Sequence, residues 1–158
     1  EYNGVIRHGA KIIYAYCECS APKISVVTRK AIGGSYVALG SRQMGADVTL
    51  AWPTAQIAVM GPEGAAPLVN GRQIREAADQ DAERQRFIEE YRKRFFNPYR
   101  AADIGQIDEV IEPRETRFQL AQALDLLRTK VVSVVPKKHG LFPVRGDQSW
   151  RISHGAWR

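Results

Sequence analysis

A pair of glycines after a β-branched run gives this sequence its clearest capacity for chemistry. Gly33 and Gly34 follow residues 23–28, KISVVT, and precede a segment that is expected to be helical from about Ser35. The first backbone N–H groups of a helix have no partner inside it, and glycine leaves them open to a ligand because it has no Cβ atom. The N–H groups of Gly34 and Ser35 are therefore candidates to hold an oxyanion, unless the glycine pair only lets the chain turn tightly.

A second glycine-rich corner runs from Gly61 to Gly64 and follows a predicted strand at 56–60. The order of strand, glycines and helix is the same as at the first corner. The residues alone favour an architectural role for this second corner over a catalytic one.

Two familiar motifs are incomplete in this chain. Residues 40–45, GSRQMG, have the glycine spacing of a P-loop, but Ala46 and Asp47 stand where Lys and Ser or Thr would reach phosphate and magnesium. Ser35 lies in a sequence like a nucleophile elbow, but Val37 replaces the last glycine and no histidine and acid are placed to activate the serine. These departures argue against an NTPase and against a catalytic serine.

The cysteines and histidines do not form a metal-binding pattern. Cys17 and Cys19 lie two positions apart, and no second cysteine pair or spaced histidine pair completes a zinc site. The two cysteines are predicted to be buried or half-buried thiols. His8, His139 and His154 are spread widely along the chain, so no metal is expected.

The composition is that of a globular domain. The chain has 158 residues, of which 44% are hydrophobic and 25% charged, and its net charge is +6. Residues 131–158 carry five basic residues against one acidic residue, which predicts a solvated basic tail rather than a nucleic-acid surface. No apolar run approaches the length of about 20 residues that a membrane span needs, and no signal-peptide pattern is present, so we expect a cytoplasmic protein without membrane contact.

Helical and extended periodicities alternate along the chain, which predicts an α/β layered architecture. Helices are expected at 2–19, from Tyr36 to Arg42, over most of 72–95 and after Pro113, and strands at 23–28, 48–52, 56–60 and 107–111. Apolar stripes on the first and last helices are interpreted as core faces; they consist of Ile6, Ala10, Ile13 and Cys17, and of Leu120, Leu124, Leu127 and Val131.

Five stretches of the sequence resemble the carboxyltransferase β subunit of biotin-dependent acyl-CoA carboxylases, of the propionyl-CoA carboxylase type. They are residues 3–16, 22–36, 45–65, 95–117 and 135–140. The resemblance implies a crotonase-like (ClpP/crotonase) α/β fold, with residues 1–140 forming part of the second of two related domains. It also implies that the chain starts after the opening strands of that domain and lacks the first domain. Residues 141–158 match nothing in the family and are expected to be an atypical basic tail.

The resemblance further implies an enzyme that moves a carboxyl group from carboxybiotin to the α carbon of a propionyl-CoA-like acyl-CoA. Carried onto this sequence, the backbone amides of Gly34 and Ser35 hold the urea oxygen of biotin. The family often has Ala in place of Ser35, and propionyl-type members tend to have Asp in place of Val37. Val37 is therefore predicted to line the acyl pocket and shift substrate choice, with a core position in the first helical turn as the alternative. The other residues assigned to substrate and biotin binding are Gly33, Tyr36, Val37, Gly61 and Gly64.

The resemblance also implies partners and a location. They are a biotin-carboxylase and biotin-carrier subunit, the first carboxyltransferase domain and further copies of the subunit in a dimer or hexamer. The expected location is the cytoplasm, or the mitochondrial matrix in a eukaryote, and the fragment is expected to be inactive alone.

Three alternatives remain open from the sequence. One is a non-catalytic piece that only supports oligomerisation, and another is the subunit of a biotin-dependent decarboxylase. The third is a crotonase-type hydratase or isomerase without biotin, which would need a carboxylate near the glycine corner; Asp47 and Glu63 are the nearby candidates.

Overall fold

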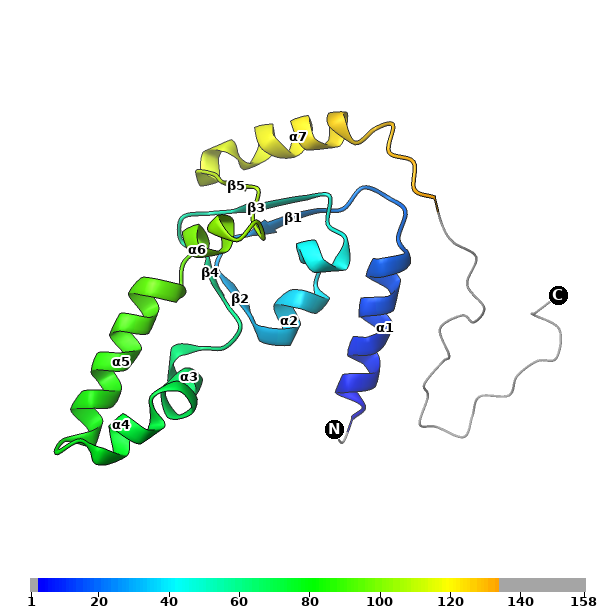
Figure 1. The fold of residues 1–158 in the computed structure, drawn as a ribbon. Helices are drawn as coiled ribbons and strands as arrows, with labels where there is room; N and C mark the ends of the chain where they lie inside the picture. Colours follow the sequence, from blue (N-terminus) through cyan, green and yellow to red (C-terminus); the bar gives the residue numbers. More distant parts are fainter. Residues whose placement is uncertain (1–2, 134–158) are drawn as a thin grey trace, which may run out of the picture.

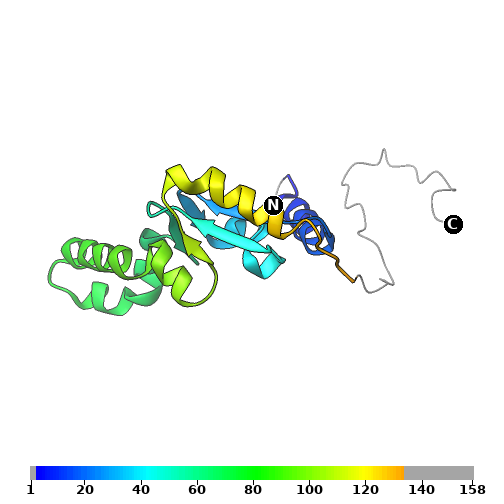
Figure 2. The ribbon, with the colours of Figure 1, turned by 90° about the horizontal axis from the view of Figure 1, so that it is seen from above.

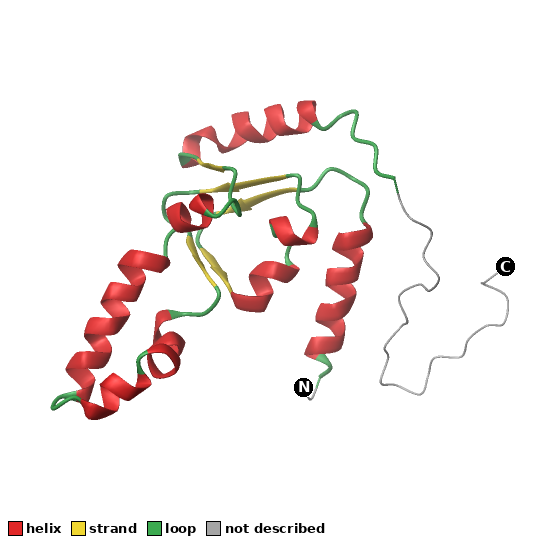
Figure 3. Ribbon diagram, viewed as in Figure 1, coloured by secondary structure: helices red, strands yellow, loops and turns green. Residues whose placement is uncertain are grey.

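Two small parallel sheets form the centre of the computed structural model, which describes residues 3–133. In spatial order, the first sheet consists of β1 (Ile24–Val27), β3 (Val48–Ala51) and β5 (Glu109–Val110), and the second of β2 (Lys30–Ile32) and β4 (Gln56–Ala58). Residues 28–29 lead β1 into β2, and residues 52–55 lead β3 into β4. The chain therefore passes twice from the first sheet into the second, and the two sheets run in different directions (Figure 3).

Helices cover both faces of the first sheet and extend beyond the second (Figure 1). Their bounds are α1 Val5–Glu18, α2 Gly33–Ala38, α3 Pro62–Val69, α4 Gly71–Glu76, α5 Gln80–Phe95, α6 Pro98–Asp103 and α7 Thr116–Leu126, with short 3-10 helices η1 Arg42–Met44 and η2 Pro113–Glu115. Helix α7 lies over one face of the first sheet, and α2 lies on the other side with α1 beside it. Helices α3, α4 and α5 pack against one another in a lobe at one end of the molecule (Figure 2).

The core between the sheets and α6 is built mainly from alanine. Its buried residues are Ala31, Ala51, Ala55, Ile57, Ala101 and Ile107. Small side chains let the strands of both sheets and helix α6 approach closely, which brings α6 beside the end of β4. This packing places α6 next to the glycine corner that begins α2.

The α/β architecture is confirmed, but β2 and α6 were not predicted and several helices are shorter than predicted. Helix α2 ends at Ala38 rather than Arg42, because Gly40 takes a left-handed conformation at φ 94° that cannot continue a helix. The predicted helix over 72–95 is interrupted between α4 and α5, where Asp79 accepts a hydrogen bond from the Ala82 N–H at 3.0 Å and starts α5 anew.

The prediction of two apolar core faces was wrong for most of the residues concerned. Helix α1 buries no residue, and Ile6 is 73% exposed. Helix α7 buries Ala123, whereas Leu124 is 54% exposed and Val131, beyond the helix end, is 91% exposed. The amphipathic pattern shows which face of a helix is apolar, but only tertiary packing decides how much of that face is covered.

The two thiols also differ from the prediction, because Cys17 and Cys19 are both exposed near the end of α1. Within residues 3–133, no helix is long and apolar enough to cross a membrane, and no group of three or more His, Cys, Asp or Glu residues could hold a metal ion. The predicted tail at 141–158 lies outside the described residues.

Candidate active site

The first glycine corner depends on a residue without a side chain at Gly33. This residue has φ 64°, a left-handed value that L side chains rarely adopt, and a Cβ atom added to it would lie 3.2 Å from the Val59 carbonyl oxygen. Gly34 has no positive φ, and a Cβ atom there would meet nothing within 4 Å. The two glycines therefore differ in function: Gly33 makes the turn, and Gly34 leaves open space beside the chain.

The N–H groups just after this turn are available to a ligand. Ile32 is the N-cap of α2, so Gly33, Gly34 and Ser35 form its first turn. The N–H groups of a first turn have no carbonyl partner inside the helix. Within residues 3–133, the N–H groups of Gly34 and Ser35 donate to no backbone or side-chain acceptor, and both residues are exposed. Two adjacent N–H donors at this corner are thus without a partner in the described part of the chain.

A groove of about 790 Å³ opens beside Gly34, and we call it the corner groove. Its wall is largely apolar, and Arg100 is the one charged residue among the described residues that line it. Its lining comprises Gly33, Gly34, Tyr36, Val37, Gln43, Ile57, Ala58, Val59, Val69, Tyr91, Phe95, Arg100, Ala101, Ile104 and Gln106. Four of the predicted site residues, Gly33, Gly34, Tyr36 and Val37, therefore meet in one hollow.

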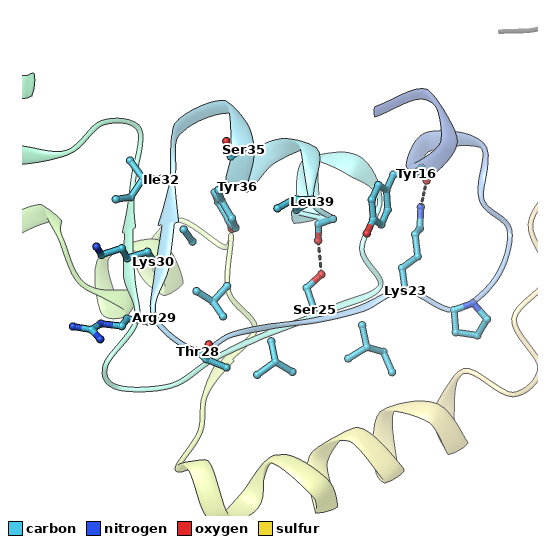
Figure 4. A pocket seen from close by; sticks show the side chains of 16 residues that line it. Tyr16, Lys23, Ser25, Thr28, Arg29, Lys30, Ile32, Ser35, Tyr36 and Leu39 are labelled. Atoms are coloured by element: carbon cyan, nitrogen blue, oxygen red, sulfur yellow. Dashed lines mark hydrogen bonds between the residues drawn. The ribbon is translucent and has the colours of Figure 1, made fainter. Parts of the chain in front are cut away.

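Ser35 lines a different hollow, of about 700 Å³, between α2, the end of α1 and the edge of β1 and β2 (Figure 4). The side chain of Tyr36 extends from α2 toward these strands, while Ser35 lies on the far side of the helix. The Ser25 hydroxyl donates to the Gly40 carbonyl, and Lys23 Nζ donates to the Tyr16 carbonyl at 2.6 Å, so these contacts tie β1 to the ends of α2 and α1. The first turn of α2 consequently separates two hollows.

Tyr36 joins the two hollows and packs against the alanine-rich core. Its hydroxyl is buried and has no hydrogen-bond partner among the described residues. Burial raises the pKa of Tyr36, so the phenol stays protonated at neutral pH. The Tyr36 ring is a packing element under the glycine corner, and its hydroxyl points toward the sheet rather than to solvent.

The second glycine corner begins α3 as predicted, with Gly61 as N-cap. Gly61 and Gly64 do not line the corner groove or the hollow beside β1. Glu63 between them forms an ion pair with Arg92 of α5. The structure therefore gives this corner a part in holding α3 against α5 and does not bring its glycines to the first corner.

The two carboxylates that a biotin-independent crotonase would need are engaged elsewhere. Asp47 Oδ2 accepts hydrogen bonds from Lys130 Nζ at 2.7 Å and from the Lys23 N–H at 2.8 Å. Burial alone would raise the pKa of Asp47, but these hydrogen bonds and the charges of both lysines outweigh it and lower the pKa. Glu63 has a lowered pKa because its own backbone N–H and Arg92 stabilise the carboxylate.

Several lining residues of the corner groove escaped prediction. Tyr91 and Phe95 come from α5, where their rings lie 5.3 Å apart, and Arg100 comes from α6. The stripe of Ile88, Tyr91 and Phe95 marked one face of α5 as apolar, but nothing in its spacing indicated that part of this face would line a groove beside Gly34. The approach of α6 depends on long-range packing that local patterns do not encode.

Parallel strands that cross between two sheets, with helices on both sides and a glycine corner that exposes amides, define a crotonase-like fold. The chain belongs to the carboxyl transferase domain family, whose model matches residues 1–142.

Similar proteins are carboxyltransferase subunits of about three to four times this length. The chain is 54% identical over 143 residues to the methylmalonyl-CoA carboxyltransferase 12S subunit of Propionibacterium freudenreichii subsp. shermanii, covering 90% of this chain and 27% of that protein. It is 52% identical over 144 residues to the propionyl-CoA carboxylase carboxyltransferase subunit of Haloferax mediterranei, covering 91% of this chain and 28% of that protein.

A solved structure of the transcarboxylase 12S hexamer, with methylmalonyl-coenzyme A and methylmalonic acid bound, superimposes with a TM-score of 0.84 at 53% identity. The match covers 88% of this chain and 27% of the 12S chain. This chain therefore spans little more than a quarter of the length of the relatives it matches.

Proposed function

We propose that this chain is the biotin-facing part of a carboxyltransferase that moves a carboxyl group from carboxybiotin to the α carbon of an acyl-CoA. The observation that carries the proposal is the pair of unpaired N–H groups at Gly34 and Ser35, two exposed residues of which Gly34 lines the corner groove, in a member of the carboxyl transferase family. The relatives named above act on methylmalonyl-CoA and propionyl-CoA, and we extend that substrate class to this chain.

Gly34 and Ser35 act through their main chain. Two fixed N–H donors suit a single oxygen that carries negative charge, such as the urea oxygen of biotin after its carboxyl group has left. Carboxybiotin, when bound, supplies the carboxyl group and then a base for the α proton of the acyl-CoA. The absence of a Cβ atom at Gly34 and the free space around it fit the approach of a flat ring to these donors.

The corner groove gives the acyl chain an apolar surface. Val37 follows the two donors by a few residues on α2 and lines the groove with Ile57, Val59 and Phe95. In this proposal, Val37 contacts the acyl group and helps to set the preferred acyl-chain length. Tyr36 supports the corner from below through its packing against the core.

The groove is open, and the proposal assigns its closure to other parts of the enzyme. These are a first carboxyltransferase domain that binds the thioester, further copies of the subunit in a dimer or hexamer, and a carrier that delivers biotin. The domain assignment of residues 1–140, the separate tail at 141–158 and a location in the cytoplasm or mitochondrial matrix belong to the same proposal.

A hydratase or isomerase without biotin fits the site less well. Such an enzyme needs a free carboxylate with a pKa near neutrality, whereas Asp47 and Glu63 are ion-paired and have lowered pKa values.

A hybrid enzyme tests the proposal. Residues 1–142 of this chain replace the matching segment of the Propionibacterium 12S subunit, and carboxyl transfer from methylmalonyl-CoA to biotin is measured. We expect transfer by the hybrid, a loss on the order of 100-fold in kcat for Ser35→Pro, which removes one N–H donor, and a mild effect of Ser35→Ala.

The alanine variant is the matched control, because it removes the hydroxyl and keeps the N–H. Unfolding of each hybrid is followed by circular dichroism to separate a loss of donor from a loss of fold. An assembled hybrid without transfer activity would refute the proposed function, and an alanine variant worse than the proline variant would refute the role of the amide. A hybrid that assembles into hexamers without any transfer would favour the alternative of an oligomerisation piece.

A further inference from the structure

We infer that Arg100 is the residue of the corner groove that recognises a carboxylate on the acyl substrate, so that the site distinguishes a carboxylated acyl group from an uncarboxylated one. The inference rests on the proposed function, because it names the substrate feature that this groove selects. It assigns a role to a residue of α6 that lies far from the glycine corner in sequence and lines the same hollow.

The groove has the composition of a site with one charged anchor. Among the described residues that line it, Arg100 alone is charged, and the wall around it is formed by groups such as Ala101, Ile104 and Phe95. Gln43 and Gln106 add two neutral amide side chains to the lining. A carboxylate entering this groove therefore meets one cation.

The guanidinium of Arg100 has N–H donors that are available to a ligand. Its ionic partner within the described residues is Asp103, whose Oδ2 lies 3.6 Å from Nη1, beyond hydrogen-bond distance, and both side chains are more than half exposed. An exposed pair at this distance contributes little energy and is easily exchanged for a ligand. By contrast, Arg42 is committed, because its Nη1 contacts both oxygens of Asp108 at 2.5 Å.

The main chain fixes the position of Arg100 while the side chain stays uncommitted. Its N–H donates to Asn97 Oδ1 at 3.0 Å, the cap that begins α6. Ala101, the next residue, is 5% exposed and anchors α6 in the core. The guanidinium is therefore presented at the groove by a positioned helix, and its planar pair of N–H groups matches a carboxylate in a bidentate arrangement.

The proposed reaction makes this recognition useful. The two acyl substrates of the transfer step differ by the carboxylate that is moved, and the apolar wall alone binds both. Arg100 adds an interaction with the carboxylated partner only, which favours that partner and holds the carboxyl group in one orientation before it is transferred.

Two small esters test the inference on the full 158-residue chain. Monoethyl methylmalonate carries an ester and one carboxylate, and ethyl isobutyrate has a methyl group in place of that carboxylate. Dissociation constants are measured by saturation-transfer NMR titration. We expect the monoethyl ester to bind about tenfold more tightly than ethyl isobutyrate, as one charge-assisted contact allows, and to lose this advantage at high salt.

Matched variants locate the preference. Arg100→Met should bring the ratio of the two dissociation constants close to one, and Arg100→Lys should restore part of it. Arg72→Met is the control, because Arg72 is an exposed arginine of α4, paired with Glu76 at 2.8 Å, that does not line the groove. This variant should keep the full ratio.

The inference is overturned if wild-type chain binds both esters alike, if neither ester binds, or if Arg100→Met keeps the preference. These outcomes do not decide the proposed function, which depends on the hybrid enzyme. A hybrid that transfers carboxyl groups while the chain shows no ester preference overturns the role of Arg100 alone.

Discussion

Alanine substitutions at Gly33 and Gly34 should change stability in opposite directions, although the two residues are adjacent. At Gly33, an alanine must adopt φ 64° and place its Cβ atom 3.2 Å from the Val59 carbonyl oxygen. The left-handed conformation costs about 1–2 kcal/mol for a residue with a Cβ atom. The reduced freedom of the unfolded chain returns about 0.4–1 kcal/mol, so the net destabilisation is about 1 kcal/mol before the close contact is counted.

At Gly34, the same change meets no obstacle. The residue lies in α2 without a positive φ, and the new Cβ atom would have no neighbour within 4 Å. Alanine in a helix is more stable than glycine by about 0.5–1 kcal/mol. The two variants should therefore differ by about 1.5–2 kcal/mol in their free energies of unfolding, with wild type between them.

Urea unfolding of the 158-residue chain, followed by far-ultraviolet circular dichroism, measures these free energies. For a chain of this size, 1 kcal/mol corresponds to a change of about 2–4 °C in melting temperature, so thermal unfolding is an independent check. Equal shifts in the same direction, or a stabilising Gly33→Ala, would show that the corner does not have the conformation described here. The inference that Gly33 shapes the turn while Gly34 leaves space for a ligand would then fail.

Two further predictions concern the edge of the sheet and the acyl pocket. Asp47→Asn should destabilise the chain by about 1–3 kcal/mol at neutral pH, because it leaves Lys130 without its anionic partner. Since the pKa of Asp47 is lowered on folding, this difference from wild type should be full above about pH 4 and disappear as the pH falls through the folded pKa; a pH-independent difference would contradict the ion pair. Val37→Asp in the hybrid 12S enzyme should change the relative rates on acetyl-, propionyl- and butyryl-CoA, and unchanged ratios would remove Val37 from the acyl pocket.

Local patterns in the sequence predicted most of the elements, because these elements have local causes, but they missed β2 and α6. The β-branched run at 23–28 forms β1, and the glycine corners begin α2 and α3 where expected. These outcomes depend on the backbone freedom of glycine and on the side-chain preferences of strands, which act within a few residues. The resemblance to a family then supplied the crotonase-like fold, which local patterns alone left as a general α/β layer.

The composition of the groove could not be predicted, because it depends on contacts distant in sequence. Arg100 and Val37 line one hollow because a core of alanines lets α6 approach the end of β4. The same limit explains the error at α1, where Ile6 belongs to an apolar stripe and is nevertheless 73% exposed. Periodicity describes one helix at a time, whereas burial is a property of two surfaces.

The exposure of Gly34 and Ser35 determines when their amides can contribute to the proposed reaction. In contact with water, a hydrogen bond to a ligand replaces one to solvent, and its net value is about 0.5–1.5 kcal/mol. In a site closed to water, fixed donors facing a developing charge contribute about 3 kcal/mol, because no solvent competes and the dielectric constant is lower. Ser35→Pro should therefore have little effect on the weak binding of free biotin by the 158-residue chain. It should have a large effect on carboxyl transfer by the hybrid enzyme, in which another domain closes the corner groove. If Ser35→Pro lowered biotin binding by the chain and carboxyl transfer by the hybrid enzyme by the same factor, closure of the groove would not strengthen the hydrogen bonds from these amides.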